Sequence, residues 1–358
     1  MVLWNQDLKD YGQLSLQLGY DSISGASPTG AYPTTETTTS ASGTTTTSGN
    51  FPQSSYTDQR KSVGFAWGRK FGANLPTIDL NYAKENDYTA KSIGFSDAWT
   101  IAGGRATIHF GAAFSRDTVS PVKNPVSNPN GLDLNYPKNT NGFSLGGSWV
   151  FGERDLADLS FSLMNLSGYL NDPYKLVTIG AVDQNETLPD ARPSTRSRKA
   201  IVGKYSHYFL WGASVNVLYR YYFDDWSVNA NTLDVTYNQR IDSDWIVSPE
   251  IRLYTQTGAY FFANRFLVPQ TYMSADYRLS PFGSVMGGLT IARNIYQGLS
   301  ANVGVTYLTQ HGRDRVTLVS TPSGGGGGEG EGGRVRTTSV SAADMNVTTV
   351  TFGLTLLY

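Results

Sequence analysis

The chain is 358 residues long, with 16% charged and 13% aromatic residues and a formal net charge of −1. So small a net charge leaves no basic face for nucleic acid, and the absence of cysteine excludes disulfides, thiolate catalysis and cysteine-bound zinc or iron–sulfur clusters. The 38 glycines and the many aromatic residues favour strands and tight turns over helices. The composition therefore predicts an all-β protein.

No segment is apolar enough to be a membrane-spanning helix, which needs roughly 18 to 20 apolar residues. The opening residues, Met1 to Asp7, lack the basic start and apolar core of a signal peptide. We therefore expect either a mature form or fragment of an exported protein, or a protein that stays inside the cell. The hydrophobic period along the chain decides between the two.

The dominant pattern is an alternation of apolar and polar residues with a period of two. Side chains on a strand alternate between two faces, so each such row has one apolar and one polar face. The polar faces consist largely of Gly, Ser, Thr, Asn and Gln. In chain order the apolar rows are Leu14, Leu16, Leu18 and Tyr20; Ile78, Leu80 and Tyr82; Ala106, Ile108, Phe110, Ala112 and Phe114; Phe143, Leu145, Trp149 and Phe151; Val215, Val217, Tyr219, Tyr221 and Phe223; and Leu299, Ala301, Val303, Val305 and Tyr307.

Two architectures share this alternation, a soluble sandwich and a transmembrane barrel. A sandwich uses short strands around a Val, Ile and Leu core, whereas these segments run to about ten or more residues, the length at which a tilted strand crosses a bilayer. Aromatic residues near segment ends, such as Trp67, Trp149, Trp226 and Tyr260, fit the girdles found at membrane interfaces. We therefore predict an all-β, transmembrane antiparallel β-barrel.

The barrel is expected to occupy residues 1–358 as one domain. We predict about sixteen strands, or about fourteen if the weakest segment and one neighbour are removed; both numbers are even, as in single-chain bacterial barrels. Long connections near 23–57, 117–140, 169–197 and 321–344 alternate with tight turns, so all four lie outside if both termini are periplasmic. The expected strands are 12–22, 58–70, 76–85, 88–100, 104–116, 141–152, 157–168, 198–209, 212–223, 226–240, 246–258, 270–280, 283–293, 298–309, 314–320 (the weakest) and 345–358.

The chain ends on an apolar row formed by Val350, Phe352, Leu354, Leu356 and Tyr358. This row resembles the C-terminal insertion signal of Gram-negative outer-membrane proteins, a final strand of alternating apolar residues that ends in Phe, Tyr or Trp. The resemblance implies that the barrel-assembly machinery reads these five residues. It also implies a location in the outer membrane of a Gram-negative bacterium, in contact with its lipid and lipopolysaccharide.

Longer motifs run through most of the chain, and together they resemble an uncharacterised bacterial barrel family that is catalogued as a domain of unknown function. The resemblance implies an outer-membrane location with no established substrate. Genes for flavin-transferring and thioredoxin-like proteins often accompany that family, which implies redox partners. The Gly/Glu insert at 324–333 departs from the family pattern, so the resemblance implies no role for this loop. The motifs are SISGASPTGAYPT at 22–34, Asp58-Gln59-Arg60, LSGYLNDPYK at 166–175, RPSTRSRKAIVGKYSHYF at 192–209, LYRYYFDDWSVNANTLDVTY at 218–237 and SADYRLSPFG at 274–283.

The predicted lumen carries the candidate functional residues. If Tyr219 and Tyr221 face lipid, Arg220 between them faces inward, because Arg or Lys on the lipid face costs about 2–4 kcal/mol at mid-bilayer. Opposite charges in the lumen can pair as structural filling, or they can face one another as a selectivity constriction. By the same parity the inward candidates are Asp79, Arg220, Asp234, Arg240, Glu250, Arg252, Asp276 and Arg278.

Catalytic and metal sites find little support in the sequence. His109, His207 and His311 are the only histidines, and they share no metal-ligand spacing. They also give no convincing Ser–His or Asp–His constellation of the kind that a hydrolase in a barrel needs. Asp242 and Asp244 could bind calcium, but acidic residues in tight turns are usually turn formers. We expect no enzyme activity, no cofactor and no metal site.

Two functions compete. About sixteen strands around a polar interior can leave an aqueous channel, which favours porin-like passage of small polar solutes. Inward charges and long loops could instead plug the lumen, which favours a closed scaffold that anchors periplasmic or surface partners, redox proteins among them. Solute passage is the interpretation that we carry forward.

Overall fold

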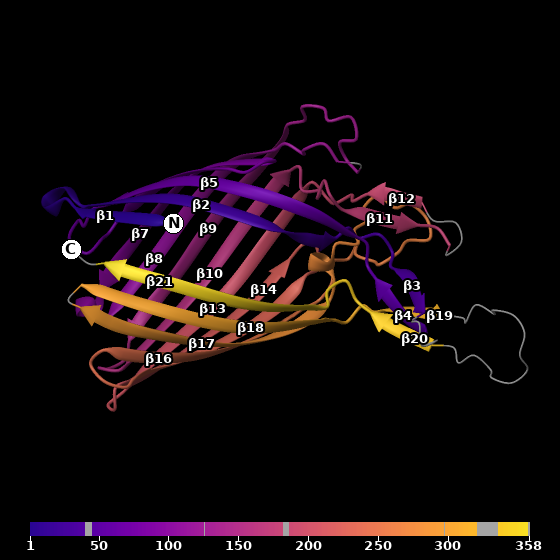
Figure 1. The fold of residues 1–358 in the computed structure, drawn as a ribbon. Helices are drawn as coiled ribbons and strands as arrows, with labels where there is room; N and C mark the ends of the chain where they lie inside the picture. The colour runs from indigo at the N-terminus through magenta and orange to yellow at the C-terminus, as the bar shows by residue number, and fades with distance from the viewer. Residues whose placement is uncertain (40–44, 125, 182–185, 297, 321–335, 357–358) are drawn as a thin grey trace, which may run out of the picture.

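A computed structural model describes the chain apart from residues 40–44, 125, 182–185, 297, 321–335 and 357–358. Its main feature is one antiparallel sheet of 15 strands that curls into a barrel (Figure 1). The strands follow the chain order around the barrel, with β1 and β21 at the two ends of the hydrogen-bonded series. They are β1 Val2–Asp7, β2 Gln13–Pro28, β5 Gln53–Gly68, β6 Thr77–Lys84, β7 Tyr88–Ile101, β8 Ala106–Val119, β9 Tyr136–Val150, β10 Asp155–Gly168, β13 Thr195–Phe209, β14 Ala213–Asp224, β15 Asn229–Arg240, β16 Trp245–Gln256, β17 Phe282–Tyr296, β18 Leu299–Gly312 and β21 Met345–Leu356.

The connections differ at the two ends of the barrel. Short turns join the strands toward the left of Figure 1. The longer connections and the small hairpins gather at the right, which we call the loop end. Three hairpins stand there outside the main sheet: β3 Thr34–Thr39 with β4 Thr45–Asn50, β11 Leu176–Ile179 with β12 Glu186–Pro189, and β19 Val316–Ser320 with β20 Arg336–Val340. Strand β20 lies against β4, so connections from opposite ends of the sequence meet.

One of the expected strands was wrong, and a second lies outside the barrel wall. Residues 270–280 form no strand; they belong to the connection 257–281 and contain a single 3-10 turn, η3, at Tyr277–Leu279. Residues 314–320 overlap β19, which pairs with β20 and takes no part in the barrel wall. Without these two, the expected strands correspond to the 14 members of the sheet other than the six-residue β1.

Several loops are shorter than expected, because backbone pairing of the strands extends further than the side-chain alternation. Strand β2 continues to Pro28 and β5 begins at Gln53, so the residues at both ends of 23–57 are paired strand. In the same way β8 reaches Val119 and β9 begins at Tyr136, which leaves 120–135 as the connection. The described part of 169–197 is interrupted by β11 and β12, and most of 321–344 lies outside the described residues.

The apolar face of the sheet points away from the lumen. Cross-strand register joins Phe110, Leu145, Phe161, Ile201 and Tyr221 into one row across five strands. These side chains stay between 37% and 59% exposed in the isolated chain, although they are large and apolar. Such a band around a barrel is the surface that lipid covers.

The closing strand continues this outer surface. Val350 and Phe352 of β21 pair in register with Val305 and Val303 of β18, and Phe352 and Leu354 are 79% and 78% exposed. The terminal residue of the predicted insertion signal, Tyr358, lies outside the described residues. The role of this row as a signal stays a prediction.

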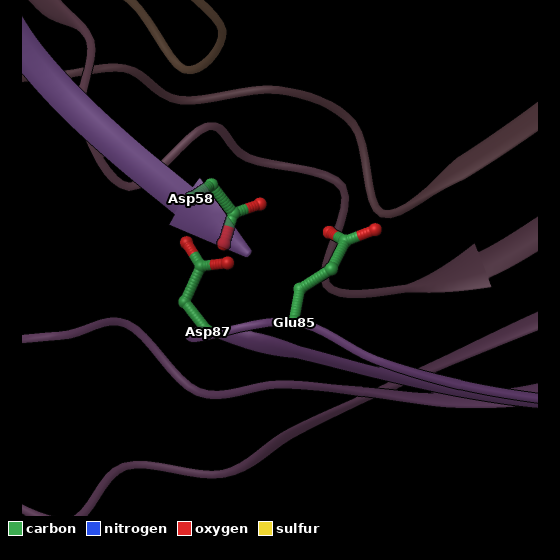
Figure 2. Close-up of side chains that lie close together, drawn as sticks. All are labelled: Asp58, Glu85 and Asp87. Carbon is green, nitrogen blue, oxygen red and sulfur yellow. The ribbon is translucent and has the colours of Figure 1, made fainter. Parts of the chain in front are cut away.

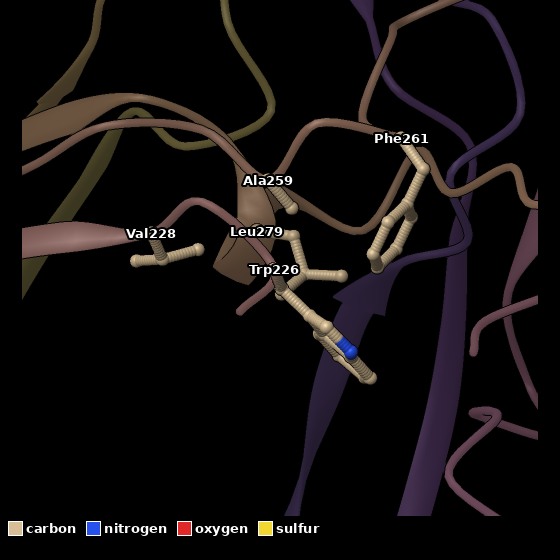
Figure 3. Packing of buried hydrophobic residues seen from close by; sticks show 5 residues of the cluster. All are labelled: Trp226, Val228, Ala259, Phe261 and Leu279. Atoms are coloured by element: carbon tan, nitrogen blue, oxygen red, sulfur yellow. The ribbon is translucent and has the colours of Figure 1, made fainter. Parts of the chain in front are cut away.

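Trp226 does not lie in the membrane-interface girdle that its position near a strand end predicts. Trp226 is only 3% exposed and lies in a buried cluster with Val228, Ala259, Phe261 and Leu279 (Figure 3). Its indole Nε1 donates to the carbonyl of Thr195 at 2.9 Å, and its ring meets Phe261 edge-on at 5.0 Å. Trp226 therefore fastens the connection 257–281 to the rim of the barrel and does not contact lipid.

No helix in the described parts of the chain is long and apolar enough to cross a membrane.

Candidate lumenal site

Besides Arg220, four of the predicted inward residues lie on the lumenal face of strands as the parity required. Asp79 on β6 accepts a hydrogen bond from Asn81 at 3.1 Å and lies over Gly94 of β7, where a Cβ would collide with its carboxylate. The other three form one group. Arg252 on β16 faces Asp234 on β15 in register, with Nη2 2.5 Å from Asp234 Oδ2 and 3.3 Å from Glu250 Oε1.

Arg220 and Arg240 occupy different levels of the barrel. Arg220 on β14 lies with its guanidinium 5.2 Å from the centre of the Tyr222 ring, and it lines an internal cavity described below. Arg240 is the last residue of β15, next to the short turn that leads to β16, and its side chain is exposed. The structure therefore separates Arg240 from the other charged candidates.

Asp276 and Arg278 also lie inside, but for a different reason from the one that the sequence suggested. They stand on the connection 257–281, not on a strand. Asp276 is the residue before η3, and it accepts a hydrogen bond from the backbone N–H of Arg278 within that turn. Asp276 is 1% exposed and contacts two guanidinium groups, that of Arg278 at 2.6 Å and that of Arg192 at 2.8 Å. Arg278 also pairs with Asp172 on the connection 169–194.

The surroundings in this network shift the pKa values of two carboxyl groups, those of Asp276 and Asp190. Burial opposes ionisation of Asp276, but hydrogen bonds and charge from Arg278, with charge from Arg192, outweigh burial and lower its pKa to about 2. The neighbouring Asp190 is held 2.5 Å from Arg192, yet burial raises its pKa above the ordinary value because desolvation exceeds the attraction of that single arginine. Asp276 is thus a firmly ionised anchor between the two connections.

Lys175, on the connection 169–194, ties this network to the end of β2. Its ammonium group donates to Ser27 Oγ at 2.7 Å and to the carbonyl of Pro28, and lies 5.6 Å from the centre of the Tyr277 ring. The backbone of Leu176 then pairs with Thr29 at 2.7 Å. The ends of β2, of the 169–194 connection and of the 257–281 connection are therefore tied together across the barrel mouth.

A second anchor lies at the loop ends of β13 and β14. Arg196 binds Asp224 through Nε at 2.8 Å and Nη2 at 2.5 Å, and Tyr222 donates to the same carboxylate oxygen at 2.6 Å. The other oxygen of Asp224 accepts from the backbone N–H groups of Trp226 and Val228. All the accepting capacity of Asp224 is used within the protein.

These anchors enclose a cavity of about 340 Å³, which we call the arginine cavity. Sequence reasoning missed Arg192, Arg196 and Arg198, although Arg196 and Arg198 share the parity of Ala200, which is buried on the inner face of β13. That parity was available in the sequence, whereas the position of Arg192 depends on how its connection folds. The lining residues are Arg192, Arg196, Arg198, Arg220, Tyr222, Val228, Tyr254, Gln256, Asp276, Arg278 and Leu279.

One acidic group could supply oxygen ligands to a metal. Asp58, Glu85 and Asp87 place carboxylate oxygens within 4.8 Å of one another at the loop end (Figure 2). Asp58 already accepts from the backbone N–H of Asn86, Asp87 accepts from the Tyr174 hydroxyl, and Glu85 lies 3.6 Å from Arg60. These contacts tie the β6–β7 turn to β5 and to Tyr174.

Two histidines pair with carboxylates. His109 Nε2 lies 3.0 Å from Asp158, with the ring packed where Gly146 has no side chain, and His207 Nδ1 lies 2.6 Å from Asp155. Among the described residues, neither pair has a hydroxyl nucleophile hydrogen-bonded to the imidazole. The geometry therefore gives two polar contacts and does not assemble a catalytic triad.

The family comparison agrees with the motifs in the sequence. The family model described as "Protein of unknown function (DUF3570)" matches residues 1–321. None of the curated proteins matches the sequence.

Solved structures with a similar fold are outer-membrane proteins. The crystal structure of the siderophore receptor PirA from Acinetobacter baumannii superposes with a TM-score of 0.52 at 11% identity, over 98% of this chain and 56% of the receptor. A mutant of the ferric enterobactin receptor PfeA from Pseudomonas aeruginosa gives a TM-score of 0.50 at 9% identity, over 97% of this chain and 55% of the receptor. At such identities the likeness concerns the fold, and this chain spans little more than half of each receptor. The predicted all-β, antiparallel β-barrel fold is confirmed, and it is the fold of these outer-membrane proteins.

Proposed function

This chain belongs to the family described as protein of unknown function (DUF3570), and we propose that its barrel passes small polar solutes across the outer membrane, as a porin does. The observation that carries the proposal is the contrast between the two faces of the sheet. Apolar side chains such as Leu145 and Phe161 face outward, whereas Asp79, Asp234 and Arg252 line the inside. A wall of this kind favours water and polar solutes in the lumen.

The charged groups inside support a selective passage more than a wide one. Arg252 is 48% exposed to the lumen although it pairs with Asp234 and Glu250, so its guanidinium is available to a passing solute. Closer to the loop end, Arg220 contacts an aromatic ring and has a free side to the arginine cavity. Facing acidic and basic groups are the usual means by which a pore discriminates ions.

A closed scaffold is the second candidate, and the tied barrel mouth favours it. Asp276, Arg192, Arg278 and Lys175 join two connections and the end of β2 across that mouth, and such a network obstructs an open channel. A barrel whose mouth is fixed in this way could anchor periplasmic or surface partners. The two solved structures are those of receptors, but this chain covers little more than half of either, so a receptor role is not carried over.

Single-channel recording of the purified chain in a planar lipid bilayer distinguishes the two functions. We expect steady conductance, and we expect Arg220→Glu and Arg252→Glu to shift the reversal potential toward cation preference, since each replaces a positive lumenal charge with a negative one. Arg154→Glu is the matched control, because Arg154 lies exposed in the turn between β9 and β10 at the opposite end.

Electrical silence of the wild-type chain, together with recovery of a periplasmic partner in pull-downs, would reject solute passage in favour of the scaffold. If the variants conduct with the same ion selectivity as the wild type, solute passage remains supported. Arg220 and Arg252 then do not line the constriction of the pore.

A further inference from the structure

The arginine cavity has an excess of positive charge in its lining. It contains five guanidinium groups, and Asp276 is the one carboxylate among its lining residues. The cavity lies between the lumenal faces of β13 to β16 and the inward-folded connection 257–281. Its volume of about 340 Å³ falls within the range of roughly 300–1,000 Å³ for small-molecule pockets.

Three of the five arginines are already neutralised by carboxylates. Arg192 pairs with Asp190 and Asp276, Arg196 pairs with Asp224, and Arg278 pairs with Asp276 and Asp172. These arginines hold the mouth of the barrel together and have little capacity left for a ligand.

Arg198 and Arg220 differ from these three. In the part of the chain that the structure describes, neither forms an ion pair, and the Nε atom of Arg198 is buried without a hydrogen-bond partner. The guanidinium of Arg220 lies 5.2 Å from the centre of the Tyr222 ring, and it has no hydrogen bond to any residue that the structure describes. A buried guanidinium N–H without an acceptor is costly, and the oxygen atoms of an anionic ligand would supply that acceptor.

The nearest carboxylate cannot supply that acceptor. Asp224 faces Arg198 in register on β14, but its two oxygens accept five hydrogen bonds from other groups. The neutral polar groups of the lining are also engaged with one another: Tyr254 donates to Gln256, and Gln256 donates to the carbonyls of Arg278 and Ser280. The donors left to a ligand are therefore the guanidinium groups of Arg198 and Arg220.

We propose that Arg198 and Arg220 form a binding site for a small oxyanion, a phosphate or carboxylate group, inside the lumen. The two residues lie on adjacent strands with their side chains on the same face, Arg198 opposite Asp224 and Arg220 opposite Val202. Each guanidinium can give two parallel N–H···O bonds to such a group, which a lysine cannot do. The site deepens the proposed solute passage, since a resident anion site would make the passage prefer anionic solutes.

Titration calorimetry of the full-length chain in detergent, at low ionic strength, tests the site with two probes, inorganic phosphate and succinate. We expect saturable binding of at least one probe, a loss of affinity of about tenfold or more in Arg198→Gln and in Arg220→Gln, and no binding in the double variant. Arg198→Lys keeps the charge and should still weaken binding, because a lysine cannot form the two parallel hydrogen bonds of a guanidinium group. Arg154→Gln is the control for removal of an exposed arginine, and heat-modifiable migration on gels shows which variants remain folded.

The two probes separate the sources of the anion: preference for phosphate indicates a phosphate group, and preference for succinate a carboxylate. Absence of binding of both probes to the folded wild-type chain, or unchanged binding in the folded double variant, overturns the site. Conductance separates this result from the proposed function: binding without conductance keeps the site and rejects the passage, whereas conductance without binding keeps the passage and rejects the site.

Discussion

Asp276 Oδ2 lies 2.8 Å from Nη2 of Arg192, and this ion pair joins two connections whose residues are 84 positions apart in the sequence. Both side chains are nearly inaccessible, at 1% and 10% exposure. Because the pair stands at the mouth of the barrel and not in its wall, it controls how the loops sit over the lumen while contributing little to the strands.

Asp276→Asn should release this loop structure. The substitution leaves Arg192 and Arg278 with fewer acidic partners, and breaking a buried ion pair in this way costs about 3–5 kcal/mol. We expect faster protease cleavage and faster amide exchange within 257–281 and an increased bilayer conductance, with heat-modifiable migration unchanged. Asp133→Asn, on an exposed residue of the 120–135 connection, should change none of these. Unchanged protection of 257–281 in Asp276→Asn would contradict the anchor.

The same anchor predicts a pH dependence. The pKa of Asp276 is lowered from 3.8 to about 2, so its contribution is complete above about pH 4 and is lost as the pH falls through about 2. Asp190 acts in the opposite direction, since a raised pKa means that protonation favours the folded state. The protection of 257–281 against amide exchange, taken relative to the intrinsic exchange rate at each pH, should therefore stay high from pH 7 to pH 4 and fall near pH 2, and this fall should be absent from Asp276→Asn. A loss of protection already at pH 5 would exclude Asp276 as the titrating group.

Trp226→Ala should detach the same connection from the barrel rim. Truncation of a buried tryptophan costs about 3–5 kcal/mol, and it also removes the hydrogen bond to Thr195 and the contact with Phe261. We expect cleavage within 257–281 under conditions that leave the wild type intact. Trp226→Phe should give an intermediate effect, and Trp211→Ala, at a tryptophan that is 64% exposed, should leave the loop protected. Equal protection in Trp226→Ala and the wild type would show that the cluster does not hold the loop.

The closing strand gives a prediction about assembly. Replacing Phe352 and Leu354 with Asp, or deleting Tyr358, should block insertion into the outer membrane, because the predicted signal is destroyed; the two aspartates also place charges on the lipid face of β21. Aspartates at Thr349 and Thr355, on the other face of the same strand, are the matched control. Membrane fractionation measures the result. Normal insertion of the Phe352 and Leu354 variants would show that the row is an ordinary strand.

The barrel itself predicts detergent dependence. The exposed row that contains Leu145 and Phe161 needs lipid or detergent to cover it, so the purified chain should aggregate once detergent is removed. Folded and heated samples should migrate differently on gels. A stable monomer in water without detergent would contradict the lipid-facing assignment.

The sequence by itself determined the wall of the barrel and its two faces. Alternation is a local property, since each strand needs only its own row of apolar side chains to choose which face meets lipid. This is why the positions of Tyr219 and Leu145 outside, and of Arg220, Asp234 and Arg252 inside, could be predicted from parity.

Only the tertiary structure decided what happens at the loop end. Residues 270–280 alternate like a strand but form a connection, in which Asp276 and Arg278 pair with Arg192 and Asp172 from another connection. Trp226 looks like a girdle residue from its position near a strand end, and it is buried because 257–281 folds over it. Contacts between segments so distant in sequence leave no periodic trace, so the arginine cavity, which depends on them, could not be read from the chain alone.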